Sequence, residues 1–148
     1  MRYDVVVIGA GPAGSTTALL LARAGVSVCV VERAQFPRTK ACGEYLNAGV
    51  VRLLQELGVA DTLRADAVPL RGVRLSGKGA RAELRFAAAG WSLPRATLDN
   101  ALLAAAIEAG ATCKAGRAER FTSERDGVRI DVRTPAGEIE QLQAAVLV

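Results

Sequence analysis

Three glycines near the start of the chain are the residues best suited to bind an anionic ligand. Gly9, Gly11 and Gly14 stand in "GAGPAG", directly after the apolar run Val5–Ile8. Gly9 allows a tight turn, Gly11 lets the main chain approach a diphosphate, and Gly14 permits close packing of a helix on a strand. Bare N–H groups at the positive end of a following helix would stabilise the diphosphate charge.

An acidic residue follows this motif at a spacing that suits contact with the ribose of a bound dinucleotide. Glu32 ends the next apolar run, about 20 residues beyond the glycines, where a carboxylate can accept hydrogen bonds from ribose hydroxyls. The same charge would repel a 2′-phosphate, which disfavours an NADP-type ligand. The pattern therefore predicts an adenine dinucleotide site, leaves FAD and NAD both open, and leaves a ligand-free α/β domain as the alternative.

The elements around the motif form a βαβ unit. Val5–Ile8 has the continuous β-branched composition of a strand buried on both faces. Pro12–Ala24 is predicted as a helix, because proline suits a first turn and Gly25 suits the stop after it. Ser27–Glu32 is predicted as the second, parallel strand, with a right-handed crossover.

The rest of the chain predicts an α/β fold in which the parallel sheet is joined by a β-hairpin or meander, as one domain spanning residues 1–148. The turn "GKG" and the dipeptide Asp126-Gly127 mark two hairpins. Further elements are predicted as follows: an irregular connection at 36–49, helices at 50–57 and 95–110, and strands at 71–76, 81–87, 111–115, 118–124, 128–133 and 143–148.

Composition excludes several classes of function. The chain has no histidine, so a Ser-His-Asp triad, a Cys-His pair and most zinc sites are excluded, and no metal site is expected. The net charge of +4 comes from scattered arginines without a basic stripe, so no nucleic-acid partner is expected. No run approaches the roughly 18 apolar residues of a membrane span, and the three widely spaced cysteines favour a reducing, cytoplasmic location.

Three segments carry a resemblance to a known family: "VVVIGAGPAGSTTALLLARAGVSVCVVER", "PRTKACGEYL" and "RATLDNALLAAAIEAGA". Over residues 4–148 the sequence resembles the N-terminal part of FAD-dependent monooxygenases related to p-hydroxybenzoate hydroxylase. It is most similar to the branch that includes geranylgeranyl reductases and flavin-dependent halogenases. The resemblance implies a Rossmann-like fold, FAD as the cofactor, NAD(P)H as the reductant and a small organic substrate.

The resemblance also implies which residues bind the cofactor, whereas it identifies no catalytic residue. Arg95 would contact the FAD phosphates or ribityl chain, since a guanidinium matches phosphate oxygens, and Asp99 could orient it. The cofactor-binding residues expected are Gly9, Gly11, Pro12, Ala13, Gly14, Glu32, Arg33, Arg38, Cys42, Gly43 and Arg95.

Simpler interpretations exist for several of these side chains. Arg38 could be an ordinary loop charge, and Arg95 with Asp99 a plain surface ion pair. The three cysteines could be small buried hydrophobes, an interpretation that is strongest for Cys29 and Cys113 on apolar strands. Trp91 is expected to pack rather than to stack on a flavin.

In the resembled enzymes the last apolar run is followed by a Gly-Ala-Asp-Gly turn and later by a substrate domain. Neither follows here, so we expect a fragment, or half of a site that a second polypeptide completes, and weak FAD binding by the chain alone. The favoured function is the FAD-binding portion of a flavin-dependent oxidoreductase, either an NAD(P)H-dependent monooxygenase or an isoprenoid-type reductase. An NAD-dependent dehydrogenase domain and a non-catalytic module that binds a partner chain are the alternatives.

Overall fold

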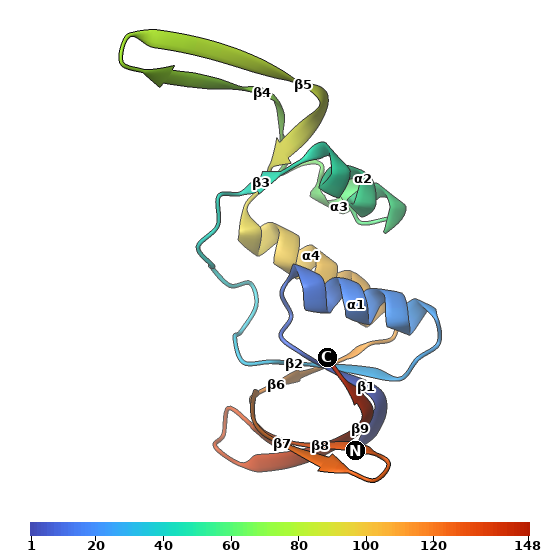
Figure 1. Cartoon of the computed structure of the whole chain (residues 1–148). Helices are drawn as coiled ribbons and strands as arrows, with labels where there is room; N and C mark the ends of the chain where they lie inside the picture. The colour runs from blue at the N-terminus through green and yellow to red at the C-terminus, as the bar shows by residue number, and fades with distance from the viewer. The chain divides into compact units, whose positions relative to one another are not determined.

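The βαβ unit at the N-terminus forms as expected. The computed structural model describes residues 1–148, and its first elements are β1 (Arg2–Ile8), α1 (Pro12–Arg23) and β2 (Val28–Glu32) (Figure 1). The strands β1 and β2 are parallel, and Val5 pairs with Val28 at the start of the register. All five residues of β2 are buried, in agreement with its unbroken apolar composition.

This unit belongs to a six-stranded sheet of order β6-β2-β1-β9-β8-β7. The strands β6, β2, β1 and β9 run parallel, whereas β9, β8 and β7 form an antiparallel meander. The remaining strands of this sheet are β6 (Thr112–Ala115), β7 (Arg117–Glu124), β8 (Gly127–Arg133) and β9 (Ile139–Leu147). The prediction of a parallel sheet joined by a meander is confirmed.

The six strands curl so that the meander folds back over the parallel strands (Figure 1). Apolar side chains from both parts pack into one cluster on the inside of the curl. The buried members of the cluster are Val6, Cys29, Val31, Ile130, Val132, Leu142 and Ala144. This packing stabilises β1, which leads into the glycine turn, and β2, which ends at Glu32.

The chain divides into two compact units, residues 1–38 with 99–148, and residues 39–98. The second unit has its own sheet of order β3-β5-β4, and Asn47 caps its helix α2 by accepting a hydrogen bond from the Val50 N–H. Its elements are β3 (Tyr45–Leu46), α2 (Ala48–Glu56), α3 (Ala60–Leu63), β4 (Val68–Gly77) and β5 (Ala80–Ser92). The helix α4 (Arg95–Glu108) begins in the second unit and continues in the first.

Some details differ from the sequence-based expectations. The short elements β3 and α3 were not predicted, because two- and four-residue elements have no measurable periodicity. The interpretation of Cys113 as a buried side chain is wrong: β6 is an edge strand, and Cys113 is exposed on it. Trp91 packs as expected, since its side chain is 8% exposed.

Every helix is too short or too polar to cross a membrane.

Candidate functional site

The glycine turn after β1 has the geometry that the motif predicts. Gly9 adopts a φ of +100°, a conformation that side chains rarely tolerate, and its N–H donates a hydrogen bond to the Val31 carbonyl oxygen at 2.8 Å. A Cβ added at Gly14 would lie 2.0 Å from the Gly9 carbonyl oxygen. The first turn of α1 therefore packs directly on the turn that leaves β1, which only glycine allows.

The N-terminus of α1 has no side-chain cap and no acidic residue in its first turn. Gly11 is the N-cap residue, with an extended backbone (φ −75°, ψ 179°) and no side chain that could cap the helix. Pro12 occupies the first helical turn, where its missing N–H is tolerated, and no acidic residue follows it in that turn. The end of the helix thus presents main-chain N–H groups and a positive dipole, the arrangement that binds phosphates.

The Glu32 carboxylate is fixed beside this turn. Its side chain is 5% exposed. One oxygen, Oε2, accepts a hydrogen bond from the Ala10 N–H at 2.7 Å, and the other, Oε1, accepts one from the Ala34 N–H at 2.8 Å. Each carboxylate oxygen keeps a second lone pair, so the group can still accept hydrogen bonds from a ligand hydroxyl.

Arg38 lies at the same site. Its Nη2 atom is 3.4 Å from Asp99 Oδ2 and 3.8 Å from Glu32 Oε2, and its guanidinium lies 5.2 Å from the centroid of the Phe36 ring. The side chain is 18% exposed, and its Nε atom is buried without a hydrogen-bond partner. The interpretation of Arg38 as an ordinary loop charge therefore does not describe its surroundings.

The Glu32 carboxylate also affects a thiol on the neighbouring strand. Although Cys113 is exposed as a residue, partial burial of its thiol group and, secondly, the negative charge of Glu32 raise the pKa of that thiol. The position follows from the register, in which Glu32 of β2 pairs with Ala115 and Val30 pairs with Cys113 of β6.

The remaining predicted residues are distributed as follows. Arg33 and Ala13 are exposed next to the site in the first unit. Cys42 and Gly43 are exposed residues of the second unit, where the Cys42 Sγ accepts a hydrogen bond from the Glu44 N–H at 3.4 Å, so Cys42 is not a buried hydrophobe. Arg95 is the first residue of α4 and also belongs to the second unit.

Sequence reasoning missed several contacts at the site. The Ala34 amide and the Phe36 ring were not singled out, and no short-range signal marks them. Asp99 was considered only as a partner for Arg95, and its 3.4 Å contact with Arg38 Nη2 was not predicted. The buried hydroxyl of Ser15, which has no hydrogen-bond partner, was also not predicted.

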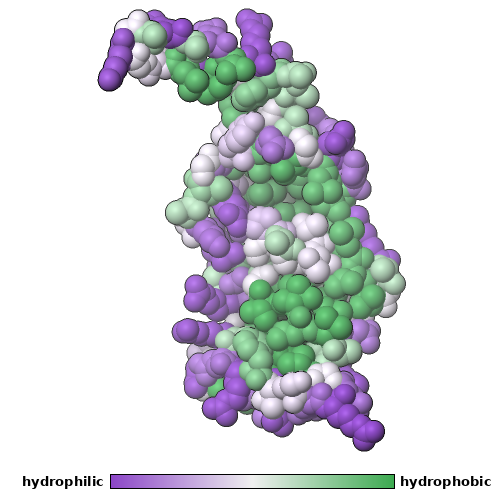
Figure 2. Space-filling model, viewed as in Figure 1, coloured by the Kyte–Doolittle hydropathy of each residue, from purple (hydrophilic) through white to green (hydrophobic).

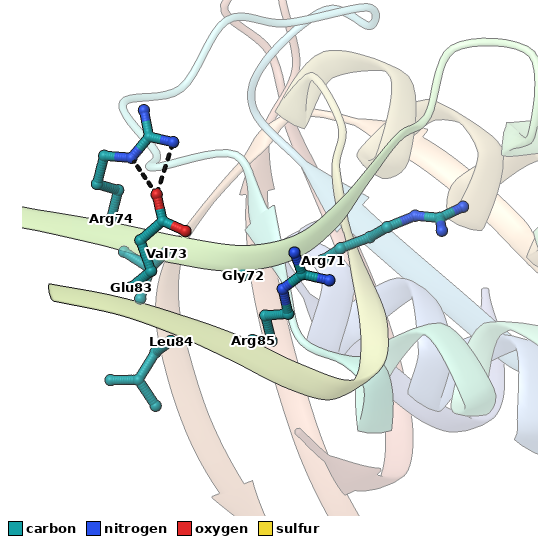
Figure 3. Close-up of a pocket in the computed structure, with 7 residues that line it drawn as sticks. All are labelled: Arg71, Gly72, Val73, Arg74, Glu83, Leu84 and Arg85. Atoms are coloured by element: carbon teal, nitrogen blue, oxygen red, sulfur yellow. Dashed lines mark hydrogen bonds and ion pairs between the residues drawn. The ribbon is translucent and has the colours of Figure 1, made fainter.

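The second unit carries a separate arginine-rich groove on its β4–β5 hairpin. Figure 3 shows Arg74 and Glu83 paired on one face, with the Leu84 side chain on the opposite face. Apolar and charged side chains alternate on this hairpin, and Figure 2 shows both kinds on its surface. The residues that line the groove are Arg71, Gly72, Val73, Arg74, Glu83, Leu84 and Arg85. The groove is open and its charged side chains are exposed, so we do not assign it a ligand.

Comparison with known proteins identifies relatives over about three quarters of the chain. The menaquinone reductase of Mycolicibacterium smegmatis is 45% identical over 120 residues, which are 78% of this chain and 29% of the relative. Digeranylgeranylglycerophospholipid reductase 1 of Methanopyrus kandleri is 38% identical over 113 residues, 75% of this chain and 29% of the relative. The chain thus spans about three tenths of the length of these curated relatives.

Solved structures agree with this relationship. The flavin-dependent brominase Bmp2 superposes with a TM-score of 0.87 at 28% identity, over 99% of this chain and 37% of the brominase. The family model described as "FAD binding domain" matches residues 2–148. The chain, with its glycine turn, uncapped helix and buried glutamate, therefore belongs to the FAD binding domain family.

Proposed function

We propose that these 148 residues supply the FAD-binding portion of an NAD(P)H-dependent oxidoreductase that acts on a small organic substrate. In this proposal the turn and the N-terminus of α1 hold the diphosphate, and Glu32 accepts hydrogen bonds from the adenosine ribose. The cofactor-binding residues proposed are Gly9, Gly11, Pro12, Ala13, Gly14, Glu32, Arg33, Arg38, Cys42, Gly43 and Arg95.

The observation that carries the proposal is the pairing of an uncapped helix N-terminus with a pre-oriented carboxylate. The Ala10 N–H donates a hydrogen bond to Glu32 at the glycine turn, which supports adjacent positions for the diphosphate and the ribose in this proposal. The buried Nε of Arg38, which has no partner, is a further donor that an oxygen of the dinucleotide would satisfy. These donors and acceptors support the binding of an adenine dinucleotide at this turn.

In this proposal the cofactor and the protein have different roles in the reaction. FAD, when bound, supplies the redox chemistry, and the protein supplies binding, orientation and electrostatics. The names of two relatives are those of reductases, which favours reduction of an isoprenoid-type substrate over hydroxylation or halogenation. We also propose that the protein is cytoplasmic. A second polypeptide would complete the site and contribute the substrate contacts.

The test is a binding titration of the 148-residue chain with FAD, monitored by quenching of flavin fluorescence, with NAD and NADP as competitors. We expect FAD to bind more tightly than NAD, and NADP to bind least. The variant Gly11→Val should lose FAD binding while keeping the circular dichroism spectrum of the folded chain, because its side chain would occupy the diphosphate position. Tighter binding of NAD than of FAD would instead indicate a dehydrogenase-type domain, and absence of binding would refute the proposal.

A further inference from the structure

Asp99 is an acidic residue whose burial requires an explanation. Its side chain is 0% exposed, and it lies within α4, 61 residues along the chain from Arg38. A buried carboxylate is costly unless a positive group or several donors compensate it. The Arg38 guanidinium, at 3.4 Å, is one such group, and this contact holds the arginine beside the proposed dinucleotide site.

Arg38 stands between two carboxylates. Its Nη2 atom is closer to Asp99 (3.4 Å) than to Glu32 (3.8 Å), although the Glu32 carboxylate is equally fixed. The Phe36 ring covers the guanidinium at 5.2 Å and restricts its plane. Because the fork of an arginine is rigid, fixing Nη2 and the plane also fixes the position of Nε.

We propose that Asp99 is a positioning residue that draws Arg38 away from Glu32. With Asp99 ionised, Glu32 keeps its outer lone pairs for the ribose, and the Arg38 guanidinium, whose Nε atom is buried without a hydrogen-bond partner, is held beside the proposed dinucleotide site. Without the Asp99 charge, the guanidinium moves onto Glu32 and forms a direct ion pair, which occupies the acceptor that the ligand needs. This inference rests on the proposed binding of FAD.

The first experiment measures FAD affinity in Asp99→Asn, Arg38→Met and the double variant. Asp99→Asn should raise the Kd for FAD about tenfold, equivalent to about 1.4 kcal/mol. In the Arg38→Met background the same change should have little further effect, because there is no guanidinium left to move. Additive effects of the two substitutions, or unchanged affinity in Asp99→Asn, would overturn the inference.

The matched control is Asp61→Asn. Asp61 also pairs with an arginine, Arg64, at 3.0 Å, but its side chain is 92% exposed on α3 and belongs to the second unit. We expect this variant to bind FAD like the unmodified chain. A loss of affinity equal to that of Asp99→Asn would show that removal of any aspartate charge suffices, and would count against a positioning role.

A second readout does not depend on FAD. In the ligand-free chain labelled with ¹⁵N-arginine, the Arg38 Nε–H resonance should shift in Asp99→Asn and should return towards its original position when Glu32→Gln is added. An unchanged resonance in Asp99→Asn would refute the positioning role even if the chain binds FAD. If the unmodified chain does not bind FAD but the resonance shifts as expected, the proposed function fails whereas the coupling of Asp99, Arg38 and Glu32 stands.

Discussion

The main-chain N–H of Ala10 donates a 2.7 Å hydrogen bond to Glu32 Oε2, joining the glycine turn after β1 to the last residue of β2. The two halves of the predicted nucleotide site are therefore one hydrogen-bonded unit. Since the carboxylate is 5% exposed and also accepts the Ala34 N–H, its charge contributes to the fold of the site before any ligand binds.

Glu32→Gln tests this dual role. A glutamine has one acceptor oxygen, so either the Ala10 or the Ala34 amide would lose its partner and face an amide N–H₂ group. We expect the free energy of unfolding to fall by about 1–3 kcal/mol, as for a buried donor left unsatisfied, and FAD affinity to fall as well. Urea unfolding and flavin titration measure the two effects. Glu56→Gln, at a side chain that is 65% exposed, should change neither.

Gly14→Ala tests the contact between α1 and the turn. The new Cβ would meet the Gly9 carbonyl oxygen at 2.0 Å, and neither backbone segment can move without disturbing the sheet. We expect the free energy of unfolding to fall by about 1–3 kcal/mol or more, as for overpacking of a core. The control is Gly77→Ala, where a Cβ meets nothing within 4 Å. An unfolding midpoint equal to that of the control would contradict the proposed close packing.

Alkylation of the cysteines should follow exposure and thiol pKa. Cys29 is buried, whereas Cys42 and Cys113 are exposed as residues. Burial raises the pKa of the Cys29 thiol. Partial burial of the thiol group, followed by the Glu32 charge, raises the pKa of Cys113. The thiolate is the reactive form, so a raised pKa slows the reaction. With iodoacetamide, peptide mass spectrometry should find Cys42 modified first, Cys113 later and Cys29 last. Early modification of Cys29 would show that the curled sheet opens readily.

Stability should decrease on the alkaline side. Burial is the main cause that raises the pKa of the Cys29 thiol above 9.0, so between pH 9 and the folded-state pKa the unfolded chain loses this proton while the folded chain retains it. The free energy of unfolding must then fall as pH rises through this window. Cys29→Ala should show a shallower decline in urea unfolding above pH 9. The control Val30→Ala, on the same buried strand, should be destabilised but keep the original slope.

Much of the site could be predicted from short-range sequence patterns. A β-branched run followed by GAGPAG and a second run ending in Glu32 specify strand, turn, helix and strand, because each element follows from local periodicity and from the steric freedom of glycine. The structure confirms these elements and their parallel pairing. The individual assignments of cofactor-binding residues remain predictions for the experiments above.

Only the tertiary structure decided how charges distant in the sequence meet. Arg38 and Asp99 are 61 residues apart, and nothing in their local sequence indicates that they form an ion pair next to Glu32. Likewise, Cys29 and Cys113 are each the second residue of a short strand, yet one is buried and the other exposed, because β2 is internal to the sheet and β6 is at its edge. The local backbone follows from the amino-acid sequence, because each turn, strand and helix start depends on neighbouring residues. Burial and electrostatic pairing depend on strand order and on the path of α4, which arise only when the whole chain packs.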